Sequence, residues 1–346
     1  MMLANTDPAL RRAWHVVARS ADVGHVPIQA RLLGEPWVLV RLPTAEGATR
    51  LAAFADRCPH RFAPLSAGRV VGSALQCAYH GWCFDGGGTC TDIPALGESD
   101  HIPGRARATV PAALAERGGL VFLAPEQPRN ELFDFAIVDD PRFLHGALEP
   151  APARVGAGLM IDNFLDQAHF PFIHAATIGS DDALAVPELT IERDGYVMSV
   201  RSRQQFPNHE DRGVEQQIRP LLQTRVLDYE YRAPFGVRLR MDYVEAGGTN
   251  VIDFFVQPED DEHCVIYTLL HRDDLEDSDQ MDDCVAYETK ILGEDLWIQE
   301  QYPDLRFPLD PTAEVHTRAD RTGVELRRIL ADFVRAGSEP APAGDA

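Results

Sequence analysis

Short runs of apolar or alternating residues, separated by turn residues, fill the first third of the chain. They comprise residues 14–20, 36–42, 50–56, 69–77 and 118–125. Runs of this length, bounded by glycine, proline and small polar residues, are typical of antiparallel β-strands. The glycine-rich segment 85–89 predicts a turn, because neither a strand-then-helix pattern nor Gly-Lys-Ser/Thr follows it. We therefore expect an all-β domain over residues 1–125 and a connector over residues 126–150.

The pattern changes beyond residue 150. A helical segment is predicted at 160–175, and apolar residues recur every three or four positions at 280–301 and 323–336, as in amphipathic helices. Alternating runs between them predict the strands of a curved antiparallel sheet, at residues 196–206, 226–246, 250–258 and 264–272. The predicted fold class is α+β, with helices flanking the sheet of a second domain at 151–336. Residues 337–346 predict a disordered tail.

The charge balance excludes two classes of partner. The chain has 346 residues, of which 45% are apolar, and 32 Lys+Arg against 54 Asp+Glu give a formal net charge of −22. This surplus of negative charge repels phosphate backbones and anionic lipid headgroups, so we expect neither nucleic acid nor a membrane as a partner. No run of about 18 uncharged apolar residues and no signal-peptide pattern occurs, which predicts a cytoplasmic protein.

Cysteine and histidine occur together in two short stretches of the first domain. Cys58 and His60 are two residues apart, and Cys77 and His80 are three apart. Two thiolates and two imidazoles suit either one tetrahedral zinc ion or a [2Fe–2S] cluster with unequally ligated irons. Zinc sites more often pair like ligands within a stretch, whereas each stretch here offers one cysteine and one histidine. This order favours the cluster over structural zinc and over a metal-free arrangement.

Cys83 and Cys90 lie in the same region but outside this ligand pattern. We expect them to be small buried side chains packed beneath the metal site. Six cysteines in the whole chain are too few for a disulfide scaffold.

A second group of candidate ligands lies at residues 160–179. Asp166 and His169 are three apart, hence on one face of a predicted helix. His174 lies five residues beyond His169 and would point elsewhere on a straight helix, but Pro171 lacks an N–H and must kink or end the helix nearby. Such a kink would bring both imidazoles to one metal ion. Each histidine taken alone is more often an ordinary core residue.

Two histidines need a carboxylate to form the facial triad that holds non-haem Fe(II) and leaves positions open. Asp295 falls within the apolar face of the predicted helix at 280–301, where an unpartnered carboxylate would be costly. Ligation would remove that cost, so Asp295 is the leading candidate. Glu294, Glu288 and Asp304 are weaker ones.

Both groups resemble the motifs of one family, the Rieske non-haem iron oxygenases. The sequences CPH and CAYHGW resemble the C-x-H and C-x₂-H-Gly-Trp ligand motifs of the Rieske [2Fe–2S] domain. The resemblance implies that Cys58 and Cys77 bind one iron of the cluster and that His60 and His80 bind the other.

The second group resembles the same family independently. DNFLDQAHFPFIH is similar to its D/E-x₂-H-x₄-H iron motif, and EDLWIQEQ resembles the later segment with the third ligand. The resemblance implies a mononuclear Fe(II) bound by His169, His174 and Asp295. It also implies that Asp166 links a Rieske histidine of one subunit to an iron-binding histidine of the next, in a homotrimer, and that Asn163 lies near the iron.

The resemblance also implies the partners. The chain has no Gly-x-Gly-x-x-Gly fingerprint and no plant-type ferredoxin spacing, so electrons must come from a separate ferredoxin or flavin reductase. Arg57, Arg61 and Arg69 flank the cluster ligands, and we hypothesise that they dock an acidic donor; ordinary solvated charges are the equal alternative. O₂ and a small-molecule substrate complete the set, the latter in a pocket walled by the strands of 190–270 with a possible lid at 205–222.

The chain has no long insertions and so resembles the homotrimeric monooxygenase and demethylase branch of the family. We therefore expect hydroxylation, demethylation or N-oxygenation of an aromatic or alicyclic molecule. cis-Dihydroxylation is the alternative within the family. Two alternatives are not enzymes: a Rieske-type electron carrier and a zinc-stabilised binding module.

Overall fold

The computed structural model describes the chain except for residues 97–100, 176, 180–183, 209–213, 215 and 339–346. The chain divides into two compact units. The smaller unit is Arg11–Arg129, and the larger unit combines Met1–Leu10 with Asn130–Ala346.

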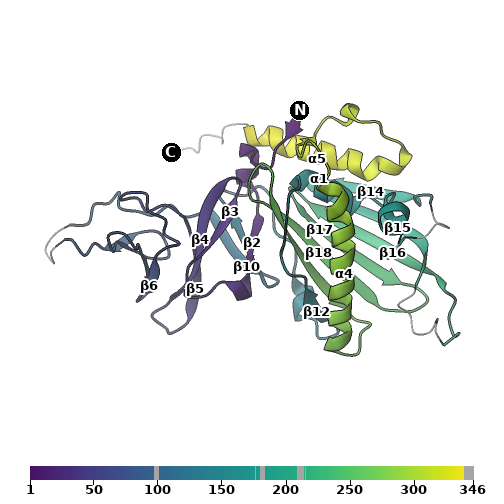
Figure 1. The fold of residues 1–346 in the computed structure, drawn as a ribbon, viewed down its shortest axis with the longest axis horizontal. Helices are drawn as coiled ribbons and strands as arrows, with labels where there is room; N and C mark the ends of the chain where they lie inside the picture. Colours follow the sequence, from purple (N-terminus) through teal and green to yellow (C-terminus); the bar gives the residue numbers. More distant parts are fainter. Residues whose placement is uncertain (97–100, 176, 180–183, 209–213, 215, 339–346) are drawn as a thin grey trace. The chain divides into compact units, whose positions relative to one another are not determined.

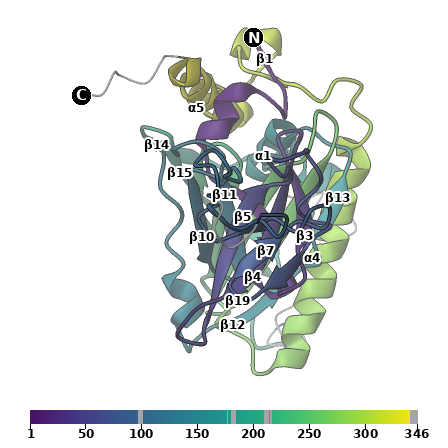
Figure 2. The same ribbon diagram turned by 90° about the vertical axis from the view of Figure 1, so that its left-hand side faces the viewer.

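Two segments that the sequence places in the first domain and the connector belong to the larger unit. Strand β1 (Met2–Leu3) pairs antiparallel with β20 (Phe307–Pro308). Strand β12 (Leu144–Ala147), within the expected connector, pairs with β19 (Cys264–Arg272). Both β1 and helix α5 (Arg321–Ser338) lie at the same end of the larger unit (Figures 1 and 2).

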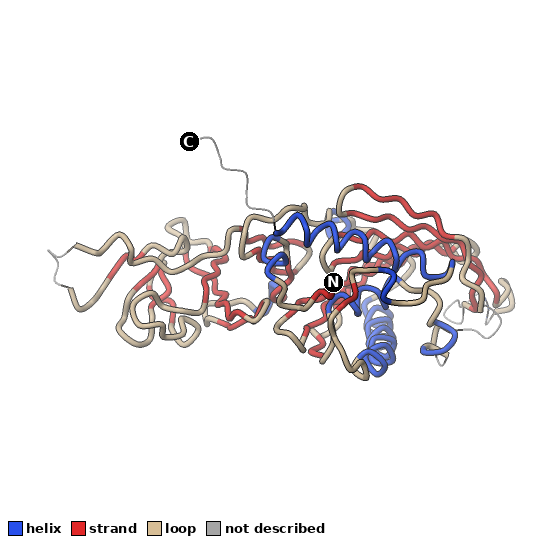
Figure 3. The backbone as a smooth tube through the Cα atoms, turned by 90° about the horizontal axis from the view of Figure 1, so that it is seen from above, coloured by secondary structure: helices blue, strands red, loops and turns tan. Residues whose placement is uncertain are grey.

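The smaller unit consists of strands, loops and short 3₁₀ turns (Figure 3). Its strands form three antiparallel sheets, ordered β10-β11-β2, β3-β4-β5 and β6-β7-β8-β9. Their bounds are β2 (His15–Arg19), β3 (Ile28–Leu32), β4 (Glu35–Pro43), β5 (Thr49–Ala55), β6 (Arg69–Val71), β7 (Ala74–Gln76), β8 (Cys83–Phe84), β9 (Cys90–Asp92), β10 (Ala113–Arg117) and β11 (Leu120–Ala124); the 3₁₀ turns are η1 (Pro8–Arg12), which begins in the larger unit, and η2 (Ser20–Asp22).

The core of the smaller unit packs beneath its cysteines. Phe54, Leu75 and Phe84 are fully buried and belong to one apolar cluster with Cys58 and Cys77. All five residues of β11 are buried, so neither face of this strand meets solvent. Burial of both faces explains its continuous apolar sequence.

The larger unit is built on one antiparallel sheet in the order β12-β19-β18-β17-β16-β15-β14, with β13 also paired to β19. The strands curve, and helix α4 (Ser278–Gln299) is seen nearly along its axis beside them in Figure 3. The remaining strands are β13 (Ala151–Ala153), β14 (Leu189–Asp194), β15 (Val197–Pro207), β16 (Leu222–Arg232), β17 (Gly236–Tyr243) and β18 (Thr249–Pro258). The other elements are α1 (Ala157–Leu165), α2 (Phe170–Ile173), α4 (Ser278–Gln299), η3 (Ala136–Asp139), η4 (Pro311–Ala313) and η5 (Arg318–Asp320). The predicted α+β fold class is confirmed.

The two faces of the large sheet bury different side chains, because successive residues of a strand point to opposite sides. On one face Phe254 of β18 stacks on Phe164 of α1, with ring centroids 4.3 Å apart. On the other face the neighbouring Asp253, fully buried, accepts two hydrogen bonds from Arg238, at 2.6 and 2.8 Å. The candidate site lies on the face that carries α1.

The helix predicted at 160–175 is interrupted, as Pro171 led us to expect, but the break lies before Pro171 rather than at it. Helix α1 ends at Leu165, and α2 begins only at Phe170. The Asp166 carboxylate accepts hydrogen bonds from the backbone N–H groups of Ala168 and His169, at 3.0 and 3.1 Å. This local capping competes with continuation of α1. Pro171 then lies in the first turn of α2, where no backbone N–H is required.

Helix α4 begins where Asp277 accepts a hydrogen bond from the Gln280 N–H at 3.0 Å, a side-chain cap. Within the described part of the chain, no helix combines the length and the apolar character needed to cross a bilayer.

Candidate metal centres and adjoining cavity

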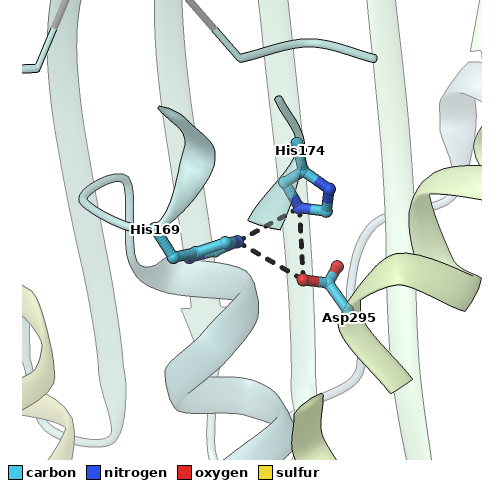
Figure 4. Close-up of side chains that lie close together, drawn as sticks. All are labelled: His169, His174 and Asp295. Carbon is cyan, nitrogen blue, oxygen red and sulfur yellow. Dashed lines mark hydrogen bonds and ion pairs between the residues drawn. The ribbon is translucent and has the colours of Figure 1, made fainter. Parts of the chain in front are cut away.

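Three donor atoms of the larger unit converge on one point (Figure 4). His169 Nε2 and His174 Nε2 are 3.2 Å apart, and Asp295 Oδ1 lies 3.4 Å from the first and 3.2 Å from the second. Ligand atoms about 2.1 Å from one ion and about 90° apart are themselves about 3 Å apart. The three side chains therefore have the spacing of ligands on one face of a single metal ion, with the other face open.

Local structure explains this convergence. His169 precedes α2 and His174 follows it, so the single turn between them returns the second imidazole to the first. Asp295 comes from the last third of α4, on its buried side. The break after α1, rather than a kink at Pro171, thus gives the histidines their relative position.

Each histidine holds its second ring nitrogen against a different carboxylate. His169 Nδ1 donates to Asp166 Oδ2 at 3.1 Å, and His174 Nδ1 donates to Glu294 Oε2 at 2.9 Å. The Thr177 hydroxyl also donates to Glu294, at 2.7 Å. Such partners fix which nitrogen of each ring is left to face a metal.

The carboxylate of the group is oriented in the same way. Asn163 Nδ2 donates to Asp295 Oδ1 at 2.9 Å, and Gln299 Nε2 donates to Asn163 Oδ1 at 2.8 Å. Asn163 is therefore fixed by α4 at both ends of its amide. The hydrogen bond between Asn163 and Asp295 links α1 to α4 directly beside the donor group.

Burial and charge set the protonation of these side chains. Burial alone would lower the pKa of His169, but hydrogen bonds with Asp166 and Asp295 raise it to about 9. Burial also opposes ionisation of Asp295, yet hydrogen bonds from His169 and His174 lower its pKa to about 2. At neutral pH the group therefore offers an ionised carboxylate, and a bound cation would replace the imidazolium proton.

The weaker candidates of the sequence analysis lie elsewhere. Glu294 points to the outer side of His174 rather than into the donor group, and Glu288 lines the adjoining cavity two turns earlier on α4. Asp304 forms an ion pair with Arg306 at 2.7 Å. Gln299 and Thr177, which hold Asn163 and Glu294 in place, were not identified from the sequence. Gln299 could have been found only from its spacing, four residues after Asp295 and hence on the same face of the helix.

The four candidate ligands of the smaller unit lie in two adjacent loops. The His60 ring stacks on Trp82 at 4.5 Å and meets His80 edge-on at 4.5 Å. Cys58 and Cys77 are each 2% exposed, and burial raises the pKa of the Cys58 thiol to about 11. His60 Nδ1 is buried, and no hydrogen-bond partner for it occurs among the described residues.

These donors fit a two-iron cluster better than one ion. The four ligands of a single tetrahedral zinc ion would all lie within about 4 Å of one another. In the described part of the chain, the only group of three such donors within 4.8 Å is that of His169, His174 and Asp295. The smaller unit thus has two thiols, two imidazoles and an unsatisfied imidazole nitrogen, but more space than one ion fills.

Cys83 and Cys90 are buried beneath these loops, as predicted, at 6% and 5% exposure. Burial raises the pKa of both thiols, which suits packing rather than reactivity. Of the three arginines, Arg57 stacks over the exposed Phe62 ring at 3.6 Å, and Arg69 donates to Gln76 Oε1 at 3.0 Å.

A cavity of about 120 Å³ opens from the donor group of the larger unit. Its walls are α1, α2 and α4 on one side and strands β15 to β19 on the other. Leu239, Ile252 and Leu270 form an apolar row across three neighbouring strands. The lid expected at 205–222 lies partly outside the described residues, which omit 209–213 and 215.

Comparison with known families identifies two domains. Residues 13–110 match the family described as Rieske [2Fe-2S] domain. Residues 154–336, more than half of the chain, match the family described as vanillate O-demethylase oxygenase C-terminal domain.

Individual proteins resemble the chain over most of its length. The methylxanthine N1-demethylase of Pseudomonas putida is 28% identical over 339 residues, which cover 95% of this chain and 91% of that protein. The dicamba O-demethylase oxygenase component of Stenotrophomonas maltophilia is 32% identical over 202 residues, 55% of each chain. Among solved structures, the Pseudomonas putida CBB5 protein NdmA with caffeine aligns with a TM-score of 0.80 at 26% identity, covering 99% of both chains.

Proposed function

Because the chain belongs to the Rieske non-haem iron oxygenases, the family of its two matched domains, we propose that it is a demethylating or hydroxylating monooxygenase of small aromatic molecules. The enzyme class follows from the family, which uses a [2Fe–2S] cluster, a mononuclear iron and a separate reductase. The likeness to an N-demethylase over most of the chain, and to an O-demethylase over about half of it, supports demethylation over cis-dihydroxylation.

We assign the mononuclear iron to His169, His174 and Asp295, whose geometry is the observation that carries the proposal. The bound iron would supply the redox chemistry by which O₂ is activated. The chain's own residues do the rest. Asp166 and Glu294 keep each imidazole in the tautomer that presents Nε2, Asn163 orients the Asp295 carboxylate, and the apolar row of the cavity excludes water from the open face.

We assign the cluster to Cys58, Cys77, His60 and His80. The Cys58 thiol, whose pKa is raised by burial, would become a thiolate on binding iron. The His60 Nδ1 atom would gain the partner that it lacks among the described residues. A neutral imidazole pair leaves less negative charge on the irons than four thiolates would, which raises the reduction potential.

Electron transfer between the two centres is proposed to occur between copies of the chain in a homotrimer. The smaller unit exposes Phe62 and Tyr79 beside its histidines, at 62% and 64%, and the larger unit exposes Phe172, at 71%, close to the partly exposed Asp166. Exposed aromatic side chains around a functional group are typical of a protein interface. Asp166 would then accept a hydrogen bond from a neighbouring copy's Rieske histidine.

The electron donor is proposed to be a ferredoxin or a flavin reductase that meets the arginines of the smaller unit. Arg61 is exposed beside His60. Reduction of the cluster should slow with rising ionic strength, and Arg61→Glu should slow it at low ionic strength. Indifference to both would leave these arginines as ordinary solvated charges.

Metal content and turnover test the function together. The full chain, loaded with iron and sulfide, should carry about three irons and the visible absorption of a Rieske centre. His169→Ala should lose about one iron and keep that absorption, whereas Cys77→Ser should lose the absorption. With a surrogate reductase, methoxy- and N-methyl-substituted aromatics should give substrate-dependent O₂ uptake and formaldehyde. A colourless zinc protein, or unchanged iron after His169→Ala, would refute the assignment, and cis-diol products would favour the alternative reaction.

A further inference from the structure

The cavity beside the proposed iron site has an apolar end and a polar end. Strand register aligns Tyr229, Leu239, Ile252 and Leu270 in one row across β16 to β19. The next row towards one end contains Asn250 and Arg272. The two rows are two residues apart on each strand, or about 7 Å.

The position of α4 shows how far each row lies from the metal donors. Arg272 Nη1 lies 3.3 Å from Cys284 Sγ, and Cys284 is eleven residues before Asp295. Eleven helical residues span about 16 Å. The row with Asn250 and Arg272 is therefore remote from the metal donors, and the row with Tyr229 is nearer to them.

Two polar groups of these rows are buried in the cavity wall. Tyr229 is 2% exposed and Asn250 is 4% exposed, and both line the cavity. Neither the Tyr229 hydroxyl nor the Asn250 Oδ1 atom has a hydrogen-bond partner among the described residues. Burying a polar group without a hydrogen bond costs about 1–3 kcal/mol, so each is a place where a ligand would gain affinity.

The chemistry of each group defines the atom that satisfies it. Burial raises the pKa of Tyr229, so its hydroxyl keeps the proton and can donate to an oxygen or nitrogen. Asn250 Oδ1 accepts from an N–H or O–H group. Arg225, 6% exposed and one row further from the metal than Asn250, brings N–H donors and a positive charge to the same end.

The charges at the polar end are mixed. Arg272 is paired with Asp274 at 2.8 Å, and Glu288 on α4 also lines the cavity. A ligand with adjacent N–H and C=O groups would donate a hydrogen bond to Asn250 Oδ1 and accept one from Arg225. Such a ligand would add no net charge. The size favours one ring over two, because a volume of about 120 Å³ is comparable to the about 150 Å³ of a cavity that holds a benzene ring.

We propose that the substrate is a single-ring molecule, polar at both ends, with a carboxamide or ring-amide group at the Asn250 end. At the other end, an oxygen or nitrogen next to the reacting methyl group accepts a hydrogen bond from Tyr229. This inference rests on the proposed demethylase function and names the substrate class of that site.

Four probe compounds of equal size separate the two contacts. 4-Methoxybenzamide has both polar ends, 4-isopropylanisole has only the ether, 4-ethylbenzamide has only the amide, and 4-methoxybenzoate replaces the amide by a carboxylate. Their binding to the iron-loaded full chain is measured by calorimetry, without reductase, so that no turnover is needed. 4-Methoxybenzamide should bind tightest, by roughly tenfold for each polar end.

Two variants assign each contact to its residue. Tyr229→Phe should weaken the three probes that carry a methoxy group by roughly tenfold and leave 4-ethylbenzamide unchanged. Asn250→Leu should weaken only the probes with an amide. Arg240→Gln, on the opposite face of the sheet and paired with Asp242, is the matched control and should change none of them.

Equal binding of all four probes, or equal losses for every probe in either variant, would overturn the inference. Tighter binding of 4-methoxybenzoate than of the benzamide would overturn the amide and identify an anionic substrate instead. O₂ uptake is measured in parallel. Selective binding without O₂ uptake would refute the proposed function but not the shape of the site, and unselective turnover would refute only the inference.

Discussion

Glu294 provides a sharp test of the proposed iron site, because it touches one ligand without belonging to the donor group. Its Oε2 atom accepts hydrogen bonds from His174 Nδ1 at 2.9 Å and from Thr177 at 2.7 Å, and its side chain is 19% exposed. The carboxylate therefore fixes the His174 tautomer and ring angle from a mostly buried position. Glu294→Gln keeps the shape and one acceptor oxygen but removes the charge.

The expected loss follows from these contacts. Removing an outer partner of a metal-bound histidine typically costs about 10- to 100-fold in metal affinity. Because the glutamine still accepts one hydrogen bond, we expect about tenfold for Glu294→Gln, and about 100-fold for Glu294→Leu, which leaves Nδ1 without an acceptor.

Competition with a chelator of known Fe(II) affinity measures this difference, with iron counted after gel filtration. The visible absorption of the cluster serves as an internal reference, since it should be unchanged. Asp282→Asn removes a charge from the exposed side of the same helix and should leave the affinity at the wild-type value. If both Glu294 variants match Asp282→Asn, His174 is not held through Glu294 and the reasoning fails.

Three further predictions concern the framework of the larger unit. Asp253→Asn leaves Arg238 unpaired in the interior and should lower the free energy of unfolding by about 3–5 kcal/mol in urea denaturation at pH 7. Burial opposes ionisation of Asp253 but Arg238 lowers its pKa, so this stabilisation is present above the unfolded pKa of about 4 and is lost as the pH falls below it; equal losses at pH 7 and pH 3 would contradict this. Gly158→Ala should destabilise by about 1–3 kcal/mol, because a Cβ atom there would lie 2.7 Å from Phe307. Gly293→Ala, with nothing within 4 Å of the new Cβ, should instead raise the melting temperature by stabilising α4 by about 0.5–1 kcal/mol, and a decrease would show a constraint on the helix that its open surroundings do not reveal.

The long strands and helices could be predicted from the sequence because their periodicity reports burial directly. The alternation at residues 196–206 corresponds to β15, and the three-and-four recurrence at 280–301 to α4. The strands β1 and β20 could not be predicted in this way, because two residues carry no periodicity and the pairing joins positions about 300 residues apart. The end of α1 was missed for a local reason. Asp166 falls within the helical pattern of its neighbours, but its carboxylate accepts hydrogen bonds from the backbone N–H groups that follow it.

The candidate ligands could be identified from residue type and spacing, whereas their surroundings could not. Two histidines and a carboxylate in these positions indicate a metal, because few other arrangements justify burying them. Which carboxylate faces which histidine depends on the side of α4 that packs against α1, and helix propensity does not determine that. Glu294 and Asp295 are adjacent in sequence and both acidic. In the structure, however, Glu294 accepts a hydrogen bond from His174 Nδ1, whereas Asp295 belongs to the donor group.

The pairing of β1 with β20 affects how the protein is made. Met2–Leu3 is translated about 300 residues before Phe307–Pro308, so β1 has no β20 partner while the intervening residues are made. The intervening smaller unit, Arg11–Arg129, can finish folding meanwhile, because its sheets are complete within its own residues. Nascent chains stalled before residue 307 should therefore carry a folded cluster-binding unit between an unpaired β1 segment and an unfinished sheet. Iron–sulfur insertion can begin at that stage, before the mononuclear site exists.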